Sequence, residues 1–352
     1  MPIHLVFADS DLPFVEKLSA WMHKNMPRKF VIEVLTSKES MQLWLESGQK
    51  ADAFLVSPSL YQENLQDLTV NVVLLDDGSH PALPDGIPRL MKYQQAPVLV
   101  KEILSLCAER MPKVHTKPSY GHMVTLVIHA DGDSVSPAGP AIATLLAESG
   151  RHTLYFSLEQ NQATDLYFHG SNTKGLNEMI YYVKSNKVNL SLLLEACCAK
   201  DPCGVDYLKA PPGLFNAMQL TKAEIDRLLQ AVLERNIYDE VVIAADLILS
   251  EALLHLAKVS DRIVITMVSG PSSGIKLRRI LNELDTRQDD AAELTKKVRL
   301  CLVKINDYIS DIPAEPKCFF TDAPLMHSAT NPYTQDYLET LRSLLEDYNS
   351  QV

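Results

Sequence analysis

The residues best placed to do chemistry lie in one short loop, between an apolar stretch at 123–128 and a helix expected from Pro137 to Glu148. Backbone N–H groups at a helix N-terminus can bind phosphate, and a lysine in such a loop neutralises the β- and γ-phosphates of a nucleotide. This loop contains no lysine, and its two carboxylates would each repel a phosphate by roughly 4 kcal/mol at about 4 Å. We therefore expect a degenerate phosphate loop that does not bind ATP in the usual position. Its residues are Ala130, Asp131, Gly132, Asp133, Ser134, Val135 and Ser136.

The elements around this loop have the order strand, loop, helix, strand. Ser136 can cap the helix, Pro137 suits its first position, and Gly150 can end it. A second apolar strand follows at 151–159 and completes a βαβ unit. An ordinary turn between strand and helix, with no relation to nucleotide binding, is the alternative interpretation.

The composition of the chain is that of a globular protein. Its 352 residues suggest two domains or one large domain, and 46% hydrophobic with 22% charged residues can form sizeable cores. The net charge of −11 argues against a broadly basic surface for nucleic acid. Because no apolar run is long enough to span a membrane and no signal peptide is evident, we expect a cytoplasmic protein.

The cysteines predict no metal site. Only Cys197, Cys198 and Cys203 lie close together among the six, and their spacing differs from the paired C-x2-C of zinc and iron–sulfur sites. In a cytoplasmic protein we expect reduced thiols on packed elements.

The first part of the chain, residues 1–108, alternates short apolar stretches with amphipathic helices. Five strands joined in this way predict an α/β domain with a flavodoxin-like, doubly wound sheet. The aromatic residues Phe14, Trp21 and Trp44 on the first two helices are expected in the core. The expected strands are 3–7, 30–35, 53–56, 70–75 and 88–91.

This order of elements resembles a response-regulator receiver domain. A receiver has an acidic pair after the first strand, a phosphoacceptor aspartate after the third, a hydroxyl after the fourth and a lysine after the fifth. Asp9 and Lys92 match, but Ser10 replaces the second acid and Ser57 stands at the phosphoacceptor position. Asp76 lies near the hydroxyl position. The resemblance implies a receiver-like domain without the groups needed for Mg²⁺ binding and phosphotransfer.

Residues 109–121 are polar and bracketed by two prolines, which predicts an extended linker before a second domain at 122–352. This second domain resembles the ParA/MinD family of P-loop ATPases. The segment 151–159 resembles the family's VLxLxLE strand, and 238–246 resembles its YDxVIID strand. The resemblance implies a second doubly wound sheet, with a P-loop NTPase fold.

The resemblance also shows what the loop has lost. Against the family pattern K-G-G-x-G-K-T-T, Ala130 stands at the signature lysine and Val135 at the lysine that binds phosphate. Only Gly132 and Ser136 match. The family's loop therefore implies a pseudo-ATPase in this chain.

A second loss concerns the strand at 238–246. In the family the strand ends in an aspartate that helps to hold the metal-bound water, whereas Ala244 occupies that position here. Asp246 follows two residues later, and Asn306 matches the adenine-contacting position loosely, so both are vestigial candidates. The C-terminal helix also differs from the basic membrane helix of MinD, because it is acidic and is expected to pack on its own domain.

Together, the two domains resemble the TadZ/CpaE group, which localises tight-adherence (Flp) pilus machinery at the cell pole. The resemblance implies a non-catalytic scaffold without cofactor or metal, which binds other pilus or secretion assembly proteins and forms a homodimer through its second domain. Partners would recruit it to the pole or inner membrane face, without membrane insertion or nucleic-acid binding. One alternative is a divergent ParA/MinD-type ATPase that binds ATP and Mg²⁺ weakly, with a lysine such as Lys174 or Lys258. A chromosome or plasmid partition protein is the other.

Overall fold

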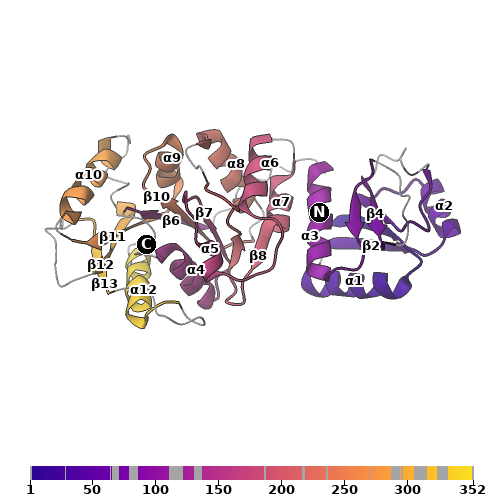
Figure 1. Cartoon of the computed structure of the whole chain (residues 1–352), viewed down its shortest axis with the longest axis horizontal. Coiled ribbons are helices and arrows are strands. Elements are labelled where there is room, and N and C mark those ends of the chain that lie inside the picture. Colours follow the sequence, from indigo (N-terminus) through magenta and orange to yellow (C-terminus); the bar gives the residue numbers. More distant parts are fainter. Residues whose placement is uncertain are drawn as a thin grey trace. The chain divides into compact units, whose positions relative to one another are not determined.

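The chain divides into two compact units, each built around one β-sheet (Figure 1). The first contains Met1–Val114 and Ser185–Ala196, and the second contains His115–Lys184 and Cys197–Val352. The predicted α/β class with two sheets is confirmed, whereas most of the predicted linker, 111–121, lies outside the described residues. The computed structural model describes residues 2–27, 29–63, 65, 71–78, 86–110, 122–130, 137–185, 188–215, 219–234, 237–270, 272–286, 294, 296–304, 315–322 and 332–350.

The first unit has a five-stranded parallel sheet in the order β2-β1-β3-β4-β5. This is one of the two common orders of doubly wound sheets. Helix α1 packs with α3, and α2 lies against β2. The strands are β1 Ile3–Ala8, β2 Phe30–Leu35, β3 Ala53–Val56, β4 Asn71–Asp76 and β5 Arg89–Met91; the helices are α1 Leu12–Asn25, α2 Lys38–Glu46 and α3 Ala96–Arg110.

Both faces of this sheet are buried, as a parallel sheet requires. Val6 and Phe54 pack with Met41 and Trp44 of α2 in one apolar cluster. The predicted core position of Trp44 is confirmed, because only 7% of its surface is exposed. Phe14 and Trp21 of α1 are only partly buried, because they lie at the margin of the stripe that faces the sheet.

A segment from much later in the chain belongs to the first unit. Residues 185–196, which include nearly all of α7 (Leu190–Cys197), cluster with the N-terminal residues. The Asn189 N–H donates to the Ala108 carbonyl over 2.9 Å, and Lys29 forms an ion pair with Glu195. The first unit is therefore discontinuous in sequence.

The second unit has an eight-stranded sheet in the order β13-β12-β11-β6-β10-β7-β9-β8. All its pairs are parallel except that between β8 and β9. Strand β6 lies in the interior of the sheet, between β10 and β11. The strands are β6 Met123–His129, β7 Thr153–Ser157, β8 Cys198–Lys200, β9 Asp206–Leu208, β10 Glu240–Asp246, β11 Arg262–Ser269, β12 Val298–Lys304 and β13 Cys318–Thr321.

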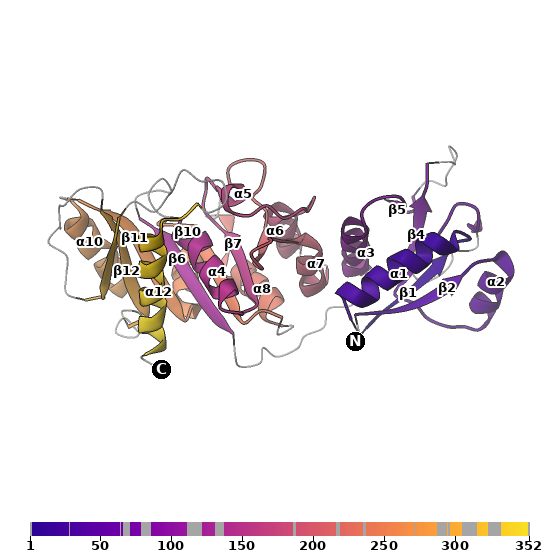
Figure 2. The same ribbon diagram turned by 90° about the horizontal axis from the view of Figure 1, so that it is seen from below.

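Helices cover both faces of the second sheet. Figures 1 and 2 show α4 and α12 on one face and α8, α9 and α10 on the other. None of the helices in the described part of the chain is both long and apolar enough to cross a bilayer. The helices are α4 Ala138–Glu148, α5 Thr164–Tyr167, α6 Leu176–Ser185, α8 Lys222–Leu233, α9 Glu251–Val259, α10 Ser273–Thr286 and α12 Gln335–Asn349.

Capping residues in the local sequence mark several of the helix ends. Helix α8 begins with a capping box, since Thr221 accepts from the Glu224 N–H and Glu224 accepts from the Thr221 N–H. Gly150 ends α4 with a φ of +85°, a conformation that glycine adopts without strain. The predicted cap at the start of α4 is wrong by one residue: Pro137 with ψ of 36° is the N-cap, and no side chain caps it.

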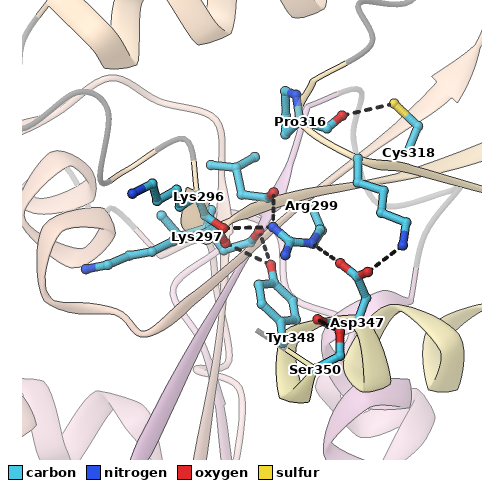
Figure 3. A network of polar contacts seen from close by, with 11 residues as sticks. Lys296, Lys297, Arg299, Pro316, Cys318, Asp347, Tyr348 and Ser350 are labelled. Atoms are coloured by element: carbon cyan, nitrogen blue, oxygen red, sulfur yellow. Dashed lines mark hydrogen bonds and ion pairs between the residues drawn. The ribbon is translucent and has the colours of Figure 1, made fainter. Parts of the chain in front are cut away.

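The C-terminal helix α12 packs on its own unit, as predicted. Its buried residues join those of α4 in one apolar cluster. At its end, the Arg299 guanidinium lies 4.6 Å from the centre of the Tyr348 ring, and Arg299 Nε donates to Asp347 Oδ2 over 2.6 Å (Figure 3). The Tyr348 hydroxyl is shared between the carbonyls of Ile263 and Lys297, at 2.7 and 2.9 Å. These contacts attach α12 to the amino ends of β11 and β12.

We expect Tyr348→Phe to lower the free energy of unfolding of the second unit by about 1–2 kcal/mol, because it removes the donor shared by the buried Ile263 carbonyl and the partly buried Lys297 carbonyl. Denaturant titration followed by circular dichroism measures the change. Tyr181→Phe is the matched control, since Tyr181 is 67% exposed and should leave the transition unchanged. An unchanged transition for Tyr348→Phe would show that the hydroxyl contacts contribute nothing.

The pKa of Asp347 predicts a pH dependence. A hydrogen bond from Lys317, together with Arg299, lowers this pKa despite partial burial. Because the folded-state pKa is depressed, its stabilisation is present above the unfolded-state value of about 3.9 and is lost as the pH falls through the folded-state pKa. Asp347→Asn should therefore unfold at lower denaturant concentration at pH 7, and the difference from wild type should disappear in acid. Glu346→Gln, exposed on the same helix, is the control; a difference independent of pH would contradict the assignment.

Candidate functional site

The candidate phosphate loop follows β6, an interior strand, at the carboxyl edge of the second sheet. In doubly wound sheets this edge is where ligands bind, at the point where the strand order reverses. Ala130 continues the pairing of β6, because its N–H donates to the Thr266 carbonyl over 2.9 Å. Residues 131–136, including Asp131, Asp133 and Val135, lie outside the described residues. The site is therefore described by the groups around the loop.

A row of four buried polar side chains lies at this edge, and we call it the His129 network. Thr266 Oγ1 lies 3.0 Å from His129 Nδ1, and His129 Nε2 lies 3.5 Å from Glu159 Oε1. Ser157 Oγ donates to Glu159 Oε2 over 2.6 Å. Each of the four residues is at most 7% exposed. The network thus links β11, β6 and the end of β7 beneath the start of α4.

The geometry of the His129 network favours internal neutralisation over catalysis. A hydroxyl can donate to or accept from His129 Nδ1, so Nε2 is able to carry a proton toward the carboxylate. Hydroxyl, imidazole and carboxylate also occur in this order in nucleophilic active sites. Thr266, however, is only 1% exposed, so no substrate can reach its hydroxyl. The carboxylate of Glu159 is instead stabilised by groups of the protein itself.

The space beside the network is small. Within the described residues, a cavity of about 20 Å³ is lined by His129, Glu159, Tyr155, Thr164 and others on α4 and α5. This volume holds about one water molecule. Burial raises the pKa of Tyr155 well above its ordinary value, so its hydroxyl stays neutral. Among the described residues, the cavity beside the network therefore has room for solvent.

Ala244 and Asp246, the two positions on β10 considered in the sequence analysis, both make contacts within the protein. Asp246 lies beside His129, and its Oδ2 accepts from the Gln160 N–H over 2.6 Å. Ala244 is fully buried against α4, where a Cβ added to Gly139 would lie 3.1 Å from the Ala244 Cβ. This close packing leaves little room for a carboxylate at position 244. Asn306 lies outside the described residues.

Neither lysine considered as a replacement lies beside the loop. Lys258 is in the last turn of α9, where its carbonyl accepts from Lys297 Nζ over 3.4 Å, next to the amino edge of the sheet. Lys174 precedes α6 near Lys209, which follows β9. β9 is three strands from β6 in the sheet order, which corresponds to roughly 14 Å at ~4.8 Å per strand. Both positions argue against a displaced phosphate-binding lysine.

The metal prediction can be examined for the described residues only. Among these, no group of three or more His, Cys, Asp or Glu side chains is arranged to hold a metal ion. All six cysteines are described and free, and burial raises the pKa of Cys107 and of Cys301 to about 12. Such thiols are neither ligands nor nucleophiles at neutral pH. The basic residues of α10, Lys276, Arg278 and Arg279, are exposed.

The carboxyl edge of the first sheet is organised around Lys92. Its Nζ lies 2.8 Å from Asp9 Oδ2 and 3.2 Å from Asp11 Oδ2. The ammonium group also lies 4.8 and 5.3 Å from the ring centres of Phe14 and Tyr93, and the Tyr93 hydroxyl donates to Asp11 Oδ2 over 3.1 Å. Burial acts to lower the pKa of Lys92, but the hydrogen bonds and charges of Asp9 and Asp11 outweigh burial and raise it. The amine stays charged and paired.

The other receiver-like positions make local contacts. Ser57 lies beside Ser59, with 3.0 Å between the hydroxyls, and Asp76 Oδ1 accepts from the Gly78 N–H over 2.9 Å. Ser10 is exposed. The side chains of Asp9 and Lys92 are thus brought into contact, and the backbone N–H of Lys92 donates to the Asp76 carbonyl over 2.8 Å. A metal ion at Asp9 would have to displace Lys92.

Sequence reasoning missed three of the residues that organise these sites. Asp11 supplies the second carboxylate to Lys92, and its signal was an acid at the start of a helix. His129 is the polar last residue of an apolar strand, and Thr266 is a polar residue within another. The pairing of His129 with Glu159 and Thr266 depends on strand order, which the sequence does not state.

The chain resembles known proteins in structure, but its sequence identity to them is low. No known family model matches the chain, and no curated protein matches it. Solved structures that resemble it include the MinC:MinD cell division protein complex of Aquifex aeolicus, with 14% identity over 64% of this chain and 96% of that chain and a TM-score of 0.49. A plasmid partition protein from Borrelia burgdorferi has 14% identity over 66% of this chain and all of that chain, with a TM-score of 0.45. A ParA family ATPase from Chlorobium tepidum TLS has 14% identity over 65% of this chain and 93% of that chain, also with a TM-score of 0.45. Because this similarity is low, any role of the candidate site has to be argued from the residues of this chain.

Proposed function

We propose that the protein is a non-catalytic localisation or scaffold protein of the TadZ/CpaE type. In this proposal a receiver-like unit precedes a degenerate ParA/MinD-like unit. The strand order β2-β1-β3-β4-β5 supports the first part, since it is the flavodoxin-like order. The interior strand β6, followed by the candidate loop and α4, supports the second part.

One observation carries the proposal: at the carboxyl edge of each sheet, the charged groups are paired with other groups of the same edge. Lys92 is held by Asp9 and Asp11, and Glu159 is held by His129 and Ser157. A Mg²⁺ ion or a phosphate group would have to compete with these internal partners. Buried pairs of this kind are costly to break, about 3–5 kcal/mol when one partner is removed. The arrangement favours a fixed structure over a catalytic cycle.

The proposed activity therefore resides in surfaces that bind other proteins. Its partners would be pilus or secretion assembly proteins, and its own second copy, with no cofactor and no nucleic acid. Recruitment to the cell pole or inner membrane face would come from those partners. The alternative is a divergent ATPase of the ParA/MinD family that binds ATP and Mg²⁺ weakly. The candidate loop argues against it, because Ala130 and Val135 stand in place of lysines and the carboxylates of Asp131 and Asp133 would repel phosphate.

We expect the purified protein not to bind Mg-ATP tightly, because the loop carries Ala130 and Val135 in place of lysines and two carboxylates beside them. Isothermal titration calorimetry tests this, with a ParA-type ATPase that retains both lysines as positive control. Circular dichroism confirms that the titrated sample is folded. A dissociation constant in the low micromolar range would favour the ATPase alternative.

We expect no phosphorylation by small phosphodonors, because Ser57 cannot form an acyl phosphate and Lys92 already neutralises Asp9. Incubation with acetyl phosphate and Mg²⁺ should leave the intact mass unchanged. Ser57→Ala is the matched control. A stable gain of one phosphate in the wild type, lost in this variant, would restore a phosphotransfer role.

A further inference from the structure

Strand β2 is the longest edge strand of the two sheets. It has 6 residues, whereas the edge strands β5, β8 and β13 have 3, 3 and 4. Among the described strands it pairs with β1 alone. An edge strand presents unpaired N–H and C=O groups along its outer side, and its length sets how many another strand can bind.

The direction of the backbone groups on β2 can be derived. The N–H groups of Ile3 and Asp9 donate to the carbonyls of Lys29 and Leu35, at 2.8 and 2.9 Å. In a parallel ladder every second residue points both of its groups at the same neighbour, so the odd-numbered residues face β1. The even-numbered residues Phe30, Ile32 and Val34 therefore direct their N–H and C=O groups to the free edge.

The side chains of β2 do little to prevent pairing. The sequence from Phe30 to Leu35 contains no proline, glycine or lysine, which commonly protect natural edges. Its one charged residue, Glu33, accepts from Trp44 Nε1 over 2.7 Å. Val31 and Val34 are 38% and 40% exposed, so apolar β-branched surface accompanies the open backbone. A six-residue segment with this composition readily pairs with another strand.

We infer that β2 pairs with β2 of a second copy of this chain, antiparallel across a two-fold axis. Such a contact is self-complementary, as a symmetric dimer requires. It would join the two five-stranded sheets into one continuous sheet of ten strands. The contact belongs to the first unit, whereas the candidate phosphate loop belongs to the second.

The register of the pairing follows from charge and backbone direction. Opposed residues in antiparallel strands lie on the same face, so a two-fold axis must oppose even-numbered residues with even-numbered ones. A register centred on Ile32 places Phe30 opposite the partner's Val34 and uses all three outward residues. A register centred on Glu33 would oppose two carboxylates, which is destabilising. Pairing centred on Ile32 is therefore preferred.

This inference rests on the proposed function only for the expectation that a dimer forms. A dimer through the candidate phosphate loops would bring together two copies of Asp131 and Asp133, which repel each other. Pairing through β2 needs no nucleotide. Its formation should therefore be the same with and without Mg-ATP.

The test is the solution mass of the full chain, measured by light scattering over a range of concentrations with and without Mg-ATP. Wild type should have the mass of two chains, and Val34→Lys should have the mass of one, because a charge on an edge strand opposes pairing. Met91→Lys is the matched control on the opposite edge of the same sheet, where Met91 is 58% exposed, and it should remain dimeric. A monomeric wild type would reject the dimer itself. A dimer that survives Val34→Lys would reject β2 as its surface while leaving the proposed function intact.

Cross-linking tests the register independently. In a pairing centred on Ile32, the two Cα atoms of this residue lie about 5.5 Å apart, within the usual range of ~4.4–6.8 Å for a disulfide. Ile32→Cys should give a reducible covalent dimer under mild oxidation. Wild type, with its six cysteines, and Met91→Cys should not. A folded, dimeric Ile32→Cys protein that does not cross-link would overturn the register.

Discussion

A charge inside a protein must be paired, and this requirement organises the carboxyl edge of both sheets. Parallel strands bring their following loops to one edge, where polar groups from separate segments meet. Lys92 meets Asp9 and Asp11 in the first unit, while Glu159 meets His129 and Ser157 in the second. Since an unpaired buried charge costs several kcal/mol, each group holds its neighbours in place. The positions at which ligands usually bind thus contain contacts of the protein with itself.

Buried charges are also paired at the amino edge of the second sheet, where the pairs connect the sheet to α12. Burial raises the pKa of Glu240, although Arg262 Nη1 lies 3.1 Å from its carboxylate and opposes the shift. Arg262 also contacts Asn349 on α12 over 3.2 Å, and Arg299 contacts Asp347 there. The buried arginines therefore connect the sheet to the C-terminal helix. On this acidic helix, the carboxylate of Asp347 faces the cations of Arg299 and Lys317 at the strand ends.

The second sheet thus has paired charges at both its amino and its carboxyl edge. The free backbone groups of β2 stand apart from this pattern. They belong to an apolar strand whose one carboxylate accepts a hydrogen bond from Trp44, so the longer edge strand in the described part of the first unit carries little charge. In the inferred dimer, a second copy of the same strand supplies hydrogen-bond partners for these backbone N–H and C=O groups. Assembly through β2 and a fixed interior are compatible, because neither depends on a bound ligand.

The sequence by itself determined the elements, because their signals are local. The strands 30–35 and 53–56 have the predicted bounds, and the local capping box of Thr221 and Glu224 starts α8. Contacts between distant segments were decided only by the tertiary structure. The meeting of His129 with Glu159 depends on which strands are neighbours, and residues 185–196 join the first unit although they follow it by more than 70 positions. Burial and strand order are properties of the whole sheet. For this reason the local sequence predicts the strands and helices at each edge, but it does not predict which side chains pair there.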